Sequence, residues 1–166
     1  MRIHNLIITL FLVSGLSVLA IAADKVHFSG VWIMDKSKSS GIPENMEQKM
    51  RVTLEGDKLD LETDLFMGDD VNTIHDGYRL NGQEVDFPAR LQSGQQTTGK
   101  RTAKWNEDGA GLEVRETATF DTPEGKVSIT MQRKWTMSAD GKTLVIELNH
   151  TGPKGPLATK RTFNRK

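Results

Sequence analysis

Apolar and polar side chains alternate along most of this chain, and turn residues interrupt the alternation every ~8–12 positions. One hairpin shows the pattern clearly, because a turn at 56–57 separates two alternating runs. Pairing the runs across this turn places Leu54 opposite Leu59 and Val52 opposite Leu61, so both apolar sets fall on one face. The pattern is typical of antiparallel strands with one buried face, and it predicts an all-β domain.

We expect about ten strands in up-and-down order, which would form an antiparallel β-barrel of about 8–10 strands. The first strand is expected over 29–35, followed by a loop over 36–47. A closed meander of this kind removes the edges that a flat sheet would expose. The clearest strands lie in the C-terminal half, over 100–106, 112–121, 127–137, 143–150 and 157–164.

The pair Asn81-Gly82 is the strongest short turn signal in the chain. It predicts a hairpin that joins a strand ending at 78–80 to a strand over 83–87. The stretch 88–98 is polar and rich in Gln and Thr. We therefore expect that stretch to be a surface loop or a weak edge strand.

Four ionisable side chains interrupt the apolar faces of the predicted C-terminal strands: Arg101, Glu116, Arg133 and His150. Pairing across the short turns places Arg101 opposite Glu116, and places both Glu116 and His150 opposite Met131. Opposite side chains lie ~5 Å apart and diagonal ones ~7–8 Å apart. The four side chains are therefore predicted to form one interior polar patch.

Two interpretations of this patch follow. In the first, it is a ligand-binding site, because two Arg and one His around Glu116 leave excess positive charge for a carboxylate or another anionic head group. Met131 and Trp105 would then contact an apolar tail. In the second, Glu116 pairs with the two arginines, His150 lies at the open rim, and no ligand binds, since buried charges are costly unless they are paired.

The N-terminal residues have the order of a secretion signal. A short, mildly basic start containing Arg2 precedes an uncharged, mostly apolar run over 6–23, which ends in small residues before the charged Asp24. We expect a signal peptide over 1–22 and a single domain over 23–166, located in the periplasm or secreted, with no stable membrane insertion after cleavage. The alternative is a retained anchor, because the run is near the lower length limit for a spanning helix.

Composition narrows the class of partner. The 22 basic and 22 acidic residues balance, and loss of Arg2 with the signal leaves a formal charge of −1. A nucleic-acid partner would need a clustered basic excess, so none is expected.

The chain has no cysteine, so its stability must come from a packed core rather than from disulfides. The scattered histidines and the absence of nucleophile or phosphate-loop motifs predict no metal, no cofactor and no enzymatic activity. We expect a monomer.

The start of the domain, Phe28-Ser29-Gly30-Val31-Trp32, and the segment 160–163 near the end resemble the calycin superfamily, which includes the lipocalins and the fatty-acid-binding proteins. The segments 30–39 and 135–144 are similar to lipocalin-like exported bacterial proteins. The resemblance implies that Trp32 plugs one end of a barrel and that Arg161 covers it as a stacked cation. The chain departs from lipocalins in having no disulfide and no C-terminal helix.

The sequence therefore predicts an exported, lipocalin-like protein that binds a small, apolar, anionic molecule such as a lipid or fatty acid. The alternative is an envelope protein-interaction or inhibitor module with a filled barrel and no ligand. Its binding surface would be the loops over 36–47 and 88–98. A filled, dry interior would favour that alternative.

Overall fold

The computed structural model describes residues 26–91 and 93–166, which contain ten strands and one short 3₁₀ turn, η1 (Lys36–Lys38). The strands are β1 (Gly30–Met34), β2 (Met46–Glu55), β3 (Lys58–Met67), β4 (Asp70–Arg79), β5 (Val85–Arg90), β6 (Gln96–Trp105), β7 (Gly111–Thr122), β8 (Gly125–Met137), β9 (Thr143–Gly152) and β10 (Gly155–Arg165). Eight of them have ten or more residues, whereas β1 has five and β5 has six.

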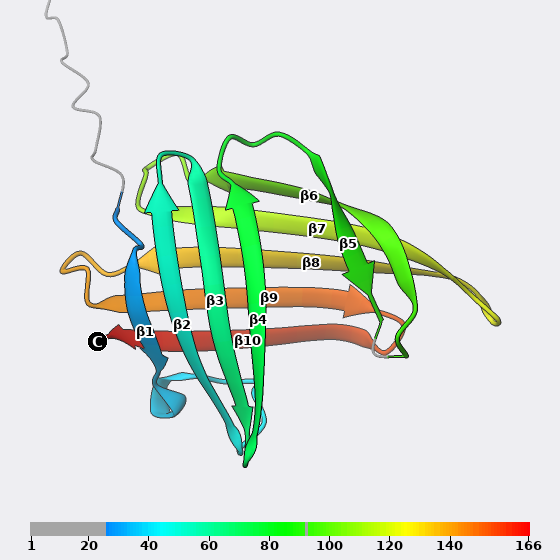
Figure 1. Cartoon of the computed structure of the whole chain (residues 1–166), viewed down its shortest axis with the longest axis horizontal. Helices are drawn as coiled ribbons and strands as arrows, with labels where there is room; N and C mark the ends of the chain where they lie inside the picture. Colours follow the sequence, from blue (N-terminus) through cyan, green and yellow to red (C-terminus); the bar gives the residue numbers. More distant parts are fainter. Residues whose placement is uncertain (1–25, 92) are drawn as a thin grey trace, which may run out of the picture.

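All ten strands belong to one antiparallel sheet in the order β4-β3-β2-β1-β10-β9-β8-β7-β6-β5. The chain is an up-and-down meander whose first strand pairs with its last, so the predicted all-β, up-and-down architecture is confirmed. The sheet curls into a half-barrel: β2–β4 cross over β6–β10, and the core lies between these two parts (Figure 1). The sheet ends at β4 and β5, so hydrogen bonds between strands do not close it into a full barrel.

The register predicted from alternation is confirmed in each hairpin where it was derived. Leu54 faces Leu59 and Val52 faces Leu61 across the β2–β3 turn. In the C-terminal half, the register pairs Arg101 with Glu116, Glu116 with Met131, and Met131 with His150. The inward faces of β6–β9 therefore carry the side chains that the period-two pattern assigned to them.

The hairpin predicted at Asn81-Gly82 is wrong. The turn itself is present, because Gly82 has a φ of 74° and the Asn81 side chain accepts a hydrogen bond from the Gln83 amide. However, β4 and β5 do not pair. Asn81 instead forms an isolated bridge with Lys104 of β6, and the Gly82 amide donates to the Ala103 carbonyl. The segment is a corner at which the chain crosses from one part of the sheet to the other.

Trp32 lies at the centre of the main core and is fully buried. Its indole Nε1 donates to the Phe28 carbonyl at 2.9 Å. The cation that covers it is Arg165, with the guanidinium carbon 4.2 Å from the ring centroid, so the expectation for Arg161 is wrong. The reason is the register: Arg165 pairs directly with Trp32, whereas Arg161 is opposite Ile146 on β9.

Arg165 also joins three separate segments. Its guanidinium donates to the carbonyls of His27 and Ser29 before β1 and to that of Gly141 in the β8–β9 turn. The Arg165 side chain thus links β10 to the segment before β1 and to the β8–β9 turn.

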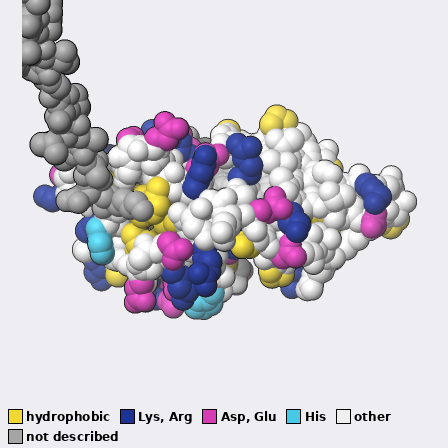
Figure 2. Space-filling view, turned by 90° about the horizontal axis from the view of Figure 1, so that it is seen from above, with side chains coloured by type: hydrophobic (Ala, Val, Ile, Leu, Met, Phe, Trp, Pro, Cys, Tyr) yellow, Lys and Arg dark blue, Asp and Glu magenta, His cyan; other side chains and the backbone are white. Residues whose placement is uncertain are grey.

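Within residues 26–91 and 93–166, no helix is long and apolar enough to cross a membrane. The expected signal peptide over 1–22 lies outside the described residues. On the face seen in Figure 2, basic side chains lie interspersed with acidic ones rather than gathered into a stripe.

Candidate functional site

Three rows of inward-facing side chains cross the C-terminal part of the sheet, because the strand registers align them. The first row contains the predicted polar patch, and the next two lie progressively closer to the main core. In strand order from β10 to β6, the rows are Leu157-His150-Met131-Glu116-Arg101, Thr159-Leu148-Arg133-Val114-Ala103 and Arg161-Ile146-Trp135-Leu112-Trp105.

Glu116 is the centre of an ion-pair cluster on this face. One carboxylate oxygen accepts from Arg101, and the other accepts from Arg133 Nη1 at 2.8 Å. The side chains of Glu116, Arg101 and Arg133 are only 7%, 12% and 22% exposed. Because the partial burial of these charges is matched by direct pairing, the cluster avoids most of the cost of an isolated charge.

Arg101 also holds the two unpaired ends of the sheet together. Its guanidinium carbon lies 4.7 Å from the Tyr78 ring on β4 and 4.5 Å from the Phe87 ring on β5. The same group donates to the Gly77 carbonyl at 3.2 Å and to the Asp76 carboxylate at 3.3 Å. Arg101 therefore links β4 to β5, which do not pair with each other, and we call this set of contacts the Arg101 clasp.

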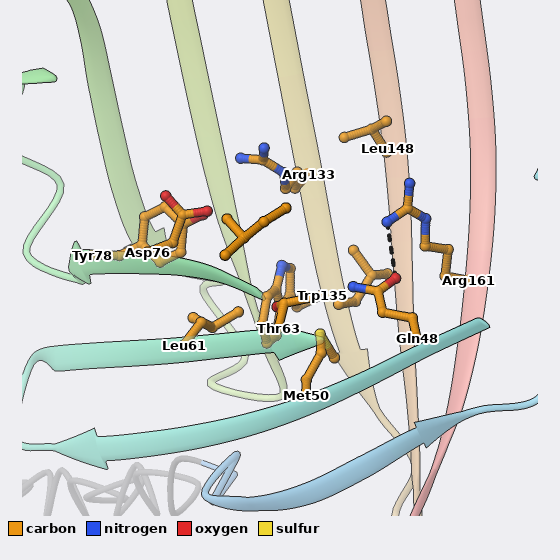
Figure 3. A pocket seen from close by; sticks show the side chains of 12 residues that line it. Gln48, Met50, Leu61, Thr63, Asp76, Tyr78, Arg133, Trp135, Leu148 and Arg161 are labelled. Atoms are coloured by element: carbon orange, nitrogen blue, oxygen red, sulfur yellow. Dashed lines mark hydrogen bonds between the residues drawn. The ribbon is translucent and has the colours of Figure 1, made fainter. Parts of the chain in front are cut away.

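A cavity of about 140 Å³ lies between the two parts of the sheet. Figure 3 shows Arg133 and Leu148 along one side of it, Asp76 and Tyr78 from β4 at another, and Arg161 near Gln48. Its wall combines apolar and polar groups. The lining residues are Gln48, Met50, Leu61, Thr63, Ile74, Asp76, Tyr78, Arg133, Trp135, Ile146, Leu148 and Arg161.

Arg161 differs from Arg101 and Arg133, the other two arginines of these three rows, because it has no acidic partner among the described residues. Its Nη1 donates to the Gln48 side-chain oxygen at 3.0 Å. Burial, together with the nearby Arg133 guanidinium, lowers the pKa of Arg161 from its usual value. No nearby carboxylate offsets these two causes in the described part of the chain.

The environment of Arg133 and Tyr78 favours a fixed protonation state at neutral pH. Burial opposes the charge of Arg133, but Tyr78, Glu116 and Asp76 outweigh it and raise the pKa of the guanidinium. Burial raises the pKa of Tyr78 to about 12, with Arg133 acting in the opposite direction. The phenol of Tyr78 is therefore protonated at neutral pH and can donate a hydrogen bond.

Two buried N–H groups of the cavity-lining side chains have no acceptor among residues 26–91 and 93–166. They are the indole Nε1 of Trp135 and the guanidinium Nε of Arg161. Such orphaned buried donors are uncommon in folded proteins and are costly.

The structure brings only part of the predicted binding set to this cavity. Of the six residues expected to contact a ligand, Arg133 lines it, whereas Arg101 and Glu116 lie behind it in the ion-pair cluster. Trp105 stacks on Phe28 at the main core, with ring centroids 5.7 Å apart, and does not line the cavity. Ligand contact by each of these residues stays a prediction.

Met131 and His150 lie one row farther out than Arg133, on partly exposed inner face. Leu157 continues this row on β10 and is 53% exposed. An apolar surface thus leads away from the cavity along β8–β10.

Sequence reasoning missed the remaining polar residues of the cavity wall. Gln48 could have been found, since it interrupts the apolar run Met46–Met50 on the inward face of β2. Arg161 was predicted to cover Trp32, and its place in the cavity wall was not predicted. By contrast, Asp76 and Tyr78 lie on β4, where no apolar alternation is present to define the inward face.

No group of three or more His, Cys, Asp or Glu side chains in the described part of the chain is arranged to hold a metal ion.

No family model matches the chain, and a search of curated proteins found no match. The solved structure of zebrafish ileal bile acid-binding protein in complex with cholic acid superposes with a TM-score of 0.53 at 15% sequence identity. It covers 84% of this chain and 98% of its own. The structure of a fatty acid transporter, REP1-NXSQ, gives a TM-score of 0.52 at 13% identity, covering 83% of this chain and 95% of its own.

The chain shares the fold of these two solved structures. The match extends over nearly the whole length of both solved structures, and the ten-stranded meander accounts for it. The calycin resemblance inferred from the sequence is therefore confirmed at the level of the fold. Identities of 15% and 13% show the fold alone and do not show which ligand this chain binds.

Proposed function

We propose that this protein is exported and binds a small, apolar, anionic molecule, such as a fatty acid or another lipid, with its anionic group beside Arg161 and Arg133. The observation that carries the proposal is the Arg161 guanidinium, which lines a cavity without an acidic partner among the described residues. An anion placed there would balance this charge.

Because the cavity is small, the head group and the tail of such a ligand would contact different surfaces. A volume of about 140 Å³ is close to that of cavities that hold a benzene-sized molecule, and it is smaller than most ligand sites. The anionic group and the first few carbon atoms would fill it. The rest of the tail would lie on the row formed by Met131, His150 and Leu157.

The calycin neighbours support a binding function. One is a bile acid-binding protein with cholic acid bound, and the other is a fatty acid transporter. Both names describe binding or transport of a small, largely apolar molecule. They support a binding role rather than an enzymatic role for this chain. A cavity with an unbalanced charge in its wall also argues against a filled barrel that acts only through its surface loops.

The export part of the proposal rests on the order of residues at the N-terminus, with a basic start, an apolar run and small residues before Asp24. We expect the protein from its own host to be recovered from the periplasm or the medium. Its intact mass should correspond to a chain that begins near residue 23. A mass that retains the apolar run would show that the segment is kept.

The binding proposal is tested with decanoate as the probe and Arg161→Met as the variant. A charge-assisted hydrogen bond is worth about 1.5–3 kcal/mol, so loss of the guanidinium should weaken decanoate binding about ten- to hundredfold. Isothermal titration calorimetry on the delipidated protein measures this change directly.

Arg115→Met is the matched control, because Arg115 lies on β7 with a side chain that is mostly exposed, and its loss changes the net charge equally. The control should bind decanoate as the wild type does. Equal affinity of the wild type and Arg161→Met, or no decanoate binding at millimolar concentration, would overturn the proposal.

A further inference from the structure

The charges around the cavity do not cancel, and their balance bears on which ligands can enter. In the described part of the chain, three guanidiniums lie in or behind the cavity wall, on Arg101, Arg133 and Arg161. Two carboxylates pair with them, on Glu116 and Asp76. One positive charge is left in excess, and it is on Arg161, which pairs with neither carboxylate.

Glu116 and Asp76 come from different elements, and both pair with Arg101. Glu116 on β7 shares its two oxygens between Arg101 and Arg133. Asp76 on β4 contacts Arg101 at 3.3 Å and lines the cavity itself. Their negative charges therefore reach the space where a head group would lie, from behind and from the side.

We propose that Glu116 and Asp76 determine the charge selectivity of the site, so that it accepts singly charged head groups and rejects doubly charged ones. This inference rests on the proposed function. A monoanion beside Arg161 would make the enclosed charges neutral. A dianion at the same place would leave one uncompensated negative charge in a partly buried site whose wall already carries Asp76, and that is costly.

An alkyl phosphate tests this proposal on the unmodified protein, because its head group changes from one negative charge to two with a pKa near 6. If only the monoanion binds, the apparent affinity follows the fraction of monoanion present. For decyl phosphate, that fraction and the affinity should fall about a hundredfold between pH 5 and pH 8. Decanesulfonate has the same tail and one charge throughout, so its affinity serves as the reference at each pH.

Decanesulfonate is needed as a reference because titratable side chains of the protein also face the site. Asp76 and Tyr78 face it from β4, Glu116 lies behind it on β7, and His150 is on the row next to it on β9. Titration of any of these groups would change the affinity for both probes. The ratio of the two affinities therefore isolates the charge of the head group.

Asp76→Asn is the variant that tests which residue sets the selectivity. The Asp76 side chain is 33% exposed, and an amide oxygen can still accept from Arg101. With one negative charge removed, the fall in relative affinity for decyl phosphate should shrink from about a hundredfold to less than about tenfold. Asp86→Asn is the matched control, because Asp86 is exposed and pairs with Lys100. It should keep the full wild-type fall.

These experiments distinguish failure of the proposed binding function from failure of the proposed charge selectivity. If neither decanesulfonate nor decyl phosphate binds, the proposed function is wrong and the selectivity is wrong with it. If both bind and their affinity ratio is the same at pH 5 and pH 8, the function stands and the charge selectivity is overturned. Asp76→Asn with an unchanged hundredfold fall would overturn the role of Asp76.

Discussion

The inward-facing arginines show how residues of one type acquire different roles from their neighbours. Arg101 and Arg133 pair with Glu116 and stabilise the sheet, whereas Arg165 covers the core indole of Trp32. Arg161 also faces inward, but its guanidinium donates to the side-chain oxygen of Gln48 and to no carboxylate among the described residues. Its charge is thus available to a ligand, whereas the charges of Arg101 and Arg133 are already matched.

A second side chain with a clear electrostatic role is Asp35, which follows β1. Its carboxylate accepts from the amide and hydroxyl of Ser37 in η1 and from the Asn164 side chain on β10. The hydrogen bond from Ser37 is the largest cause that lowers the pKa of Asp35 from 3.8 to about 2.

Because the folded-state pKa of Asp35 is depressed, the stability it contributes is fully present above pH 3.8 and is lost as the pH falls toward about 2. We expect Asp35→Asn to be less stable than the wild type at pH 5.5, with the difference shrinking by pH 2. Urea unfolding at the two pH values measures this. NMR titration of the Asp35 carboxyl should give a midpoint near 2, and a midpoint near 3.8 would contradict the assignment.

At the scale of strands, alternation predicted the registers of the C-terminal hairpins because each has one buried face and a short turn. In those hairpins, a slip by one residue would expose the apolar side chains of the strand. Alternation and turn length together were enough to place Glu116 beside both Arg101 and Arg133. The Asn81-Gly82 signal failed because a turn specifies that the chain reverses, but not which strand it pairs with next.

The clasp formed by Arg101 leads to a prediction about β4. Replacing Arg101 with Met removes its bonds to Asp76 and Gly77 and its stacking on Tyr78 and Phe87, so β4 should detach more easily. Losing one partner of a buried ion pair costs about 3–5 kcal/mol. Since Glu116 keeps Arg133, we expect a smaller loss of about 2–4 kcal/mol.

Hydrogen–deuterium exchange measured by mass spectrometry tests this prediction strand by strand. Amides of β4 should exchange faster in Arg101→Met, with little change in β9 and β10. Arg79→Met is the control, since Arg79 lies on the same strand and is exposed. If the exchange rates of the β4 amides are the same in Arg101→Met and the wild type, the contacts of Arg101 do not stabilise β4.

At the scale of the whole molecule, the two parts of the sheet meet around one core and leave a small cavity beside it. The sequence predicted the fold class and the calycin resemblance, but it could not predict the cavity. That space depends on how β2–β4 cross over β6–β10, which brings together strands that are far apart in the sequence (Figure 1). For the same reason, Asp76 and Tyr78 could not be assigned to the site from their own segment.

The central claim is that the excess charge of this cavity selects an anionic head group on an apolar tail. Calorimetric titration with decanoate, decanol and decylammonium tests it most directly, because the three probes share a tail and differ in the charge of the head group. We predict that decanoate binds with at least about tenfold higher affinity than decanol, and that decylammonium does not bind. Equal affinity for all three probes, or tighter binding of decylammonium, would contradict the claim.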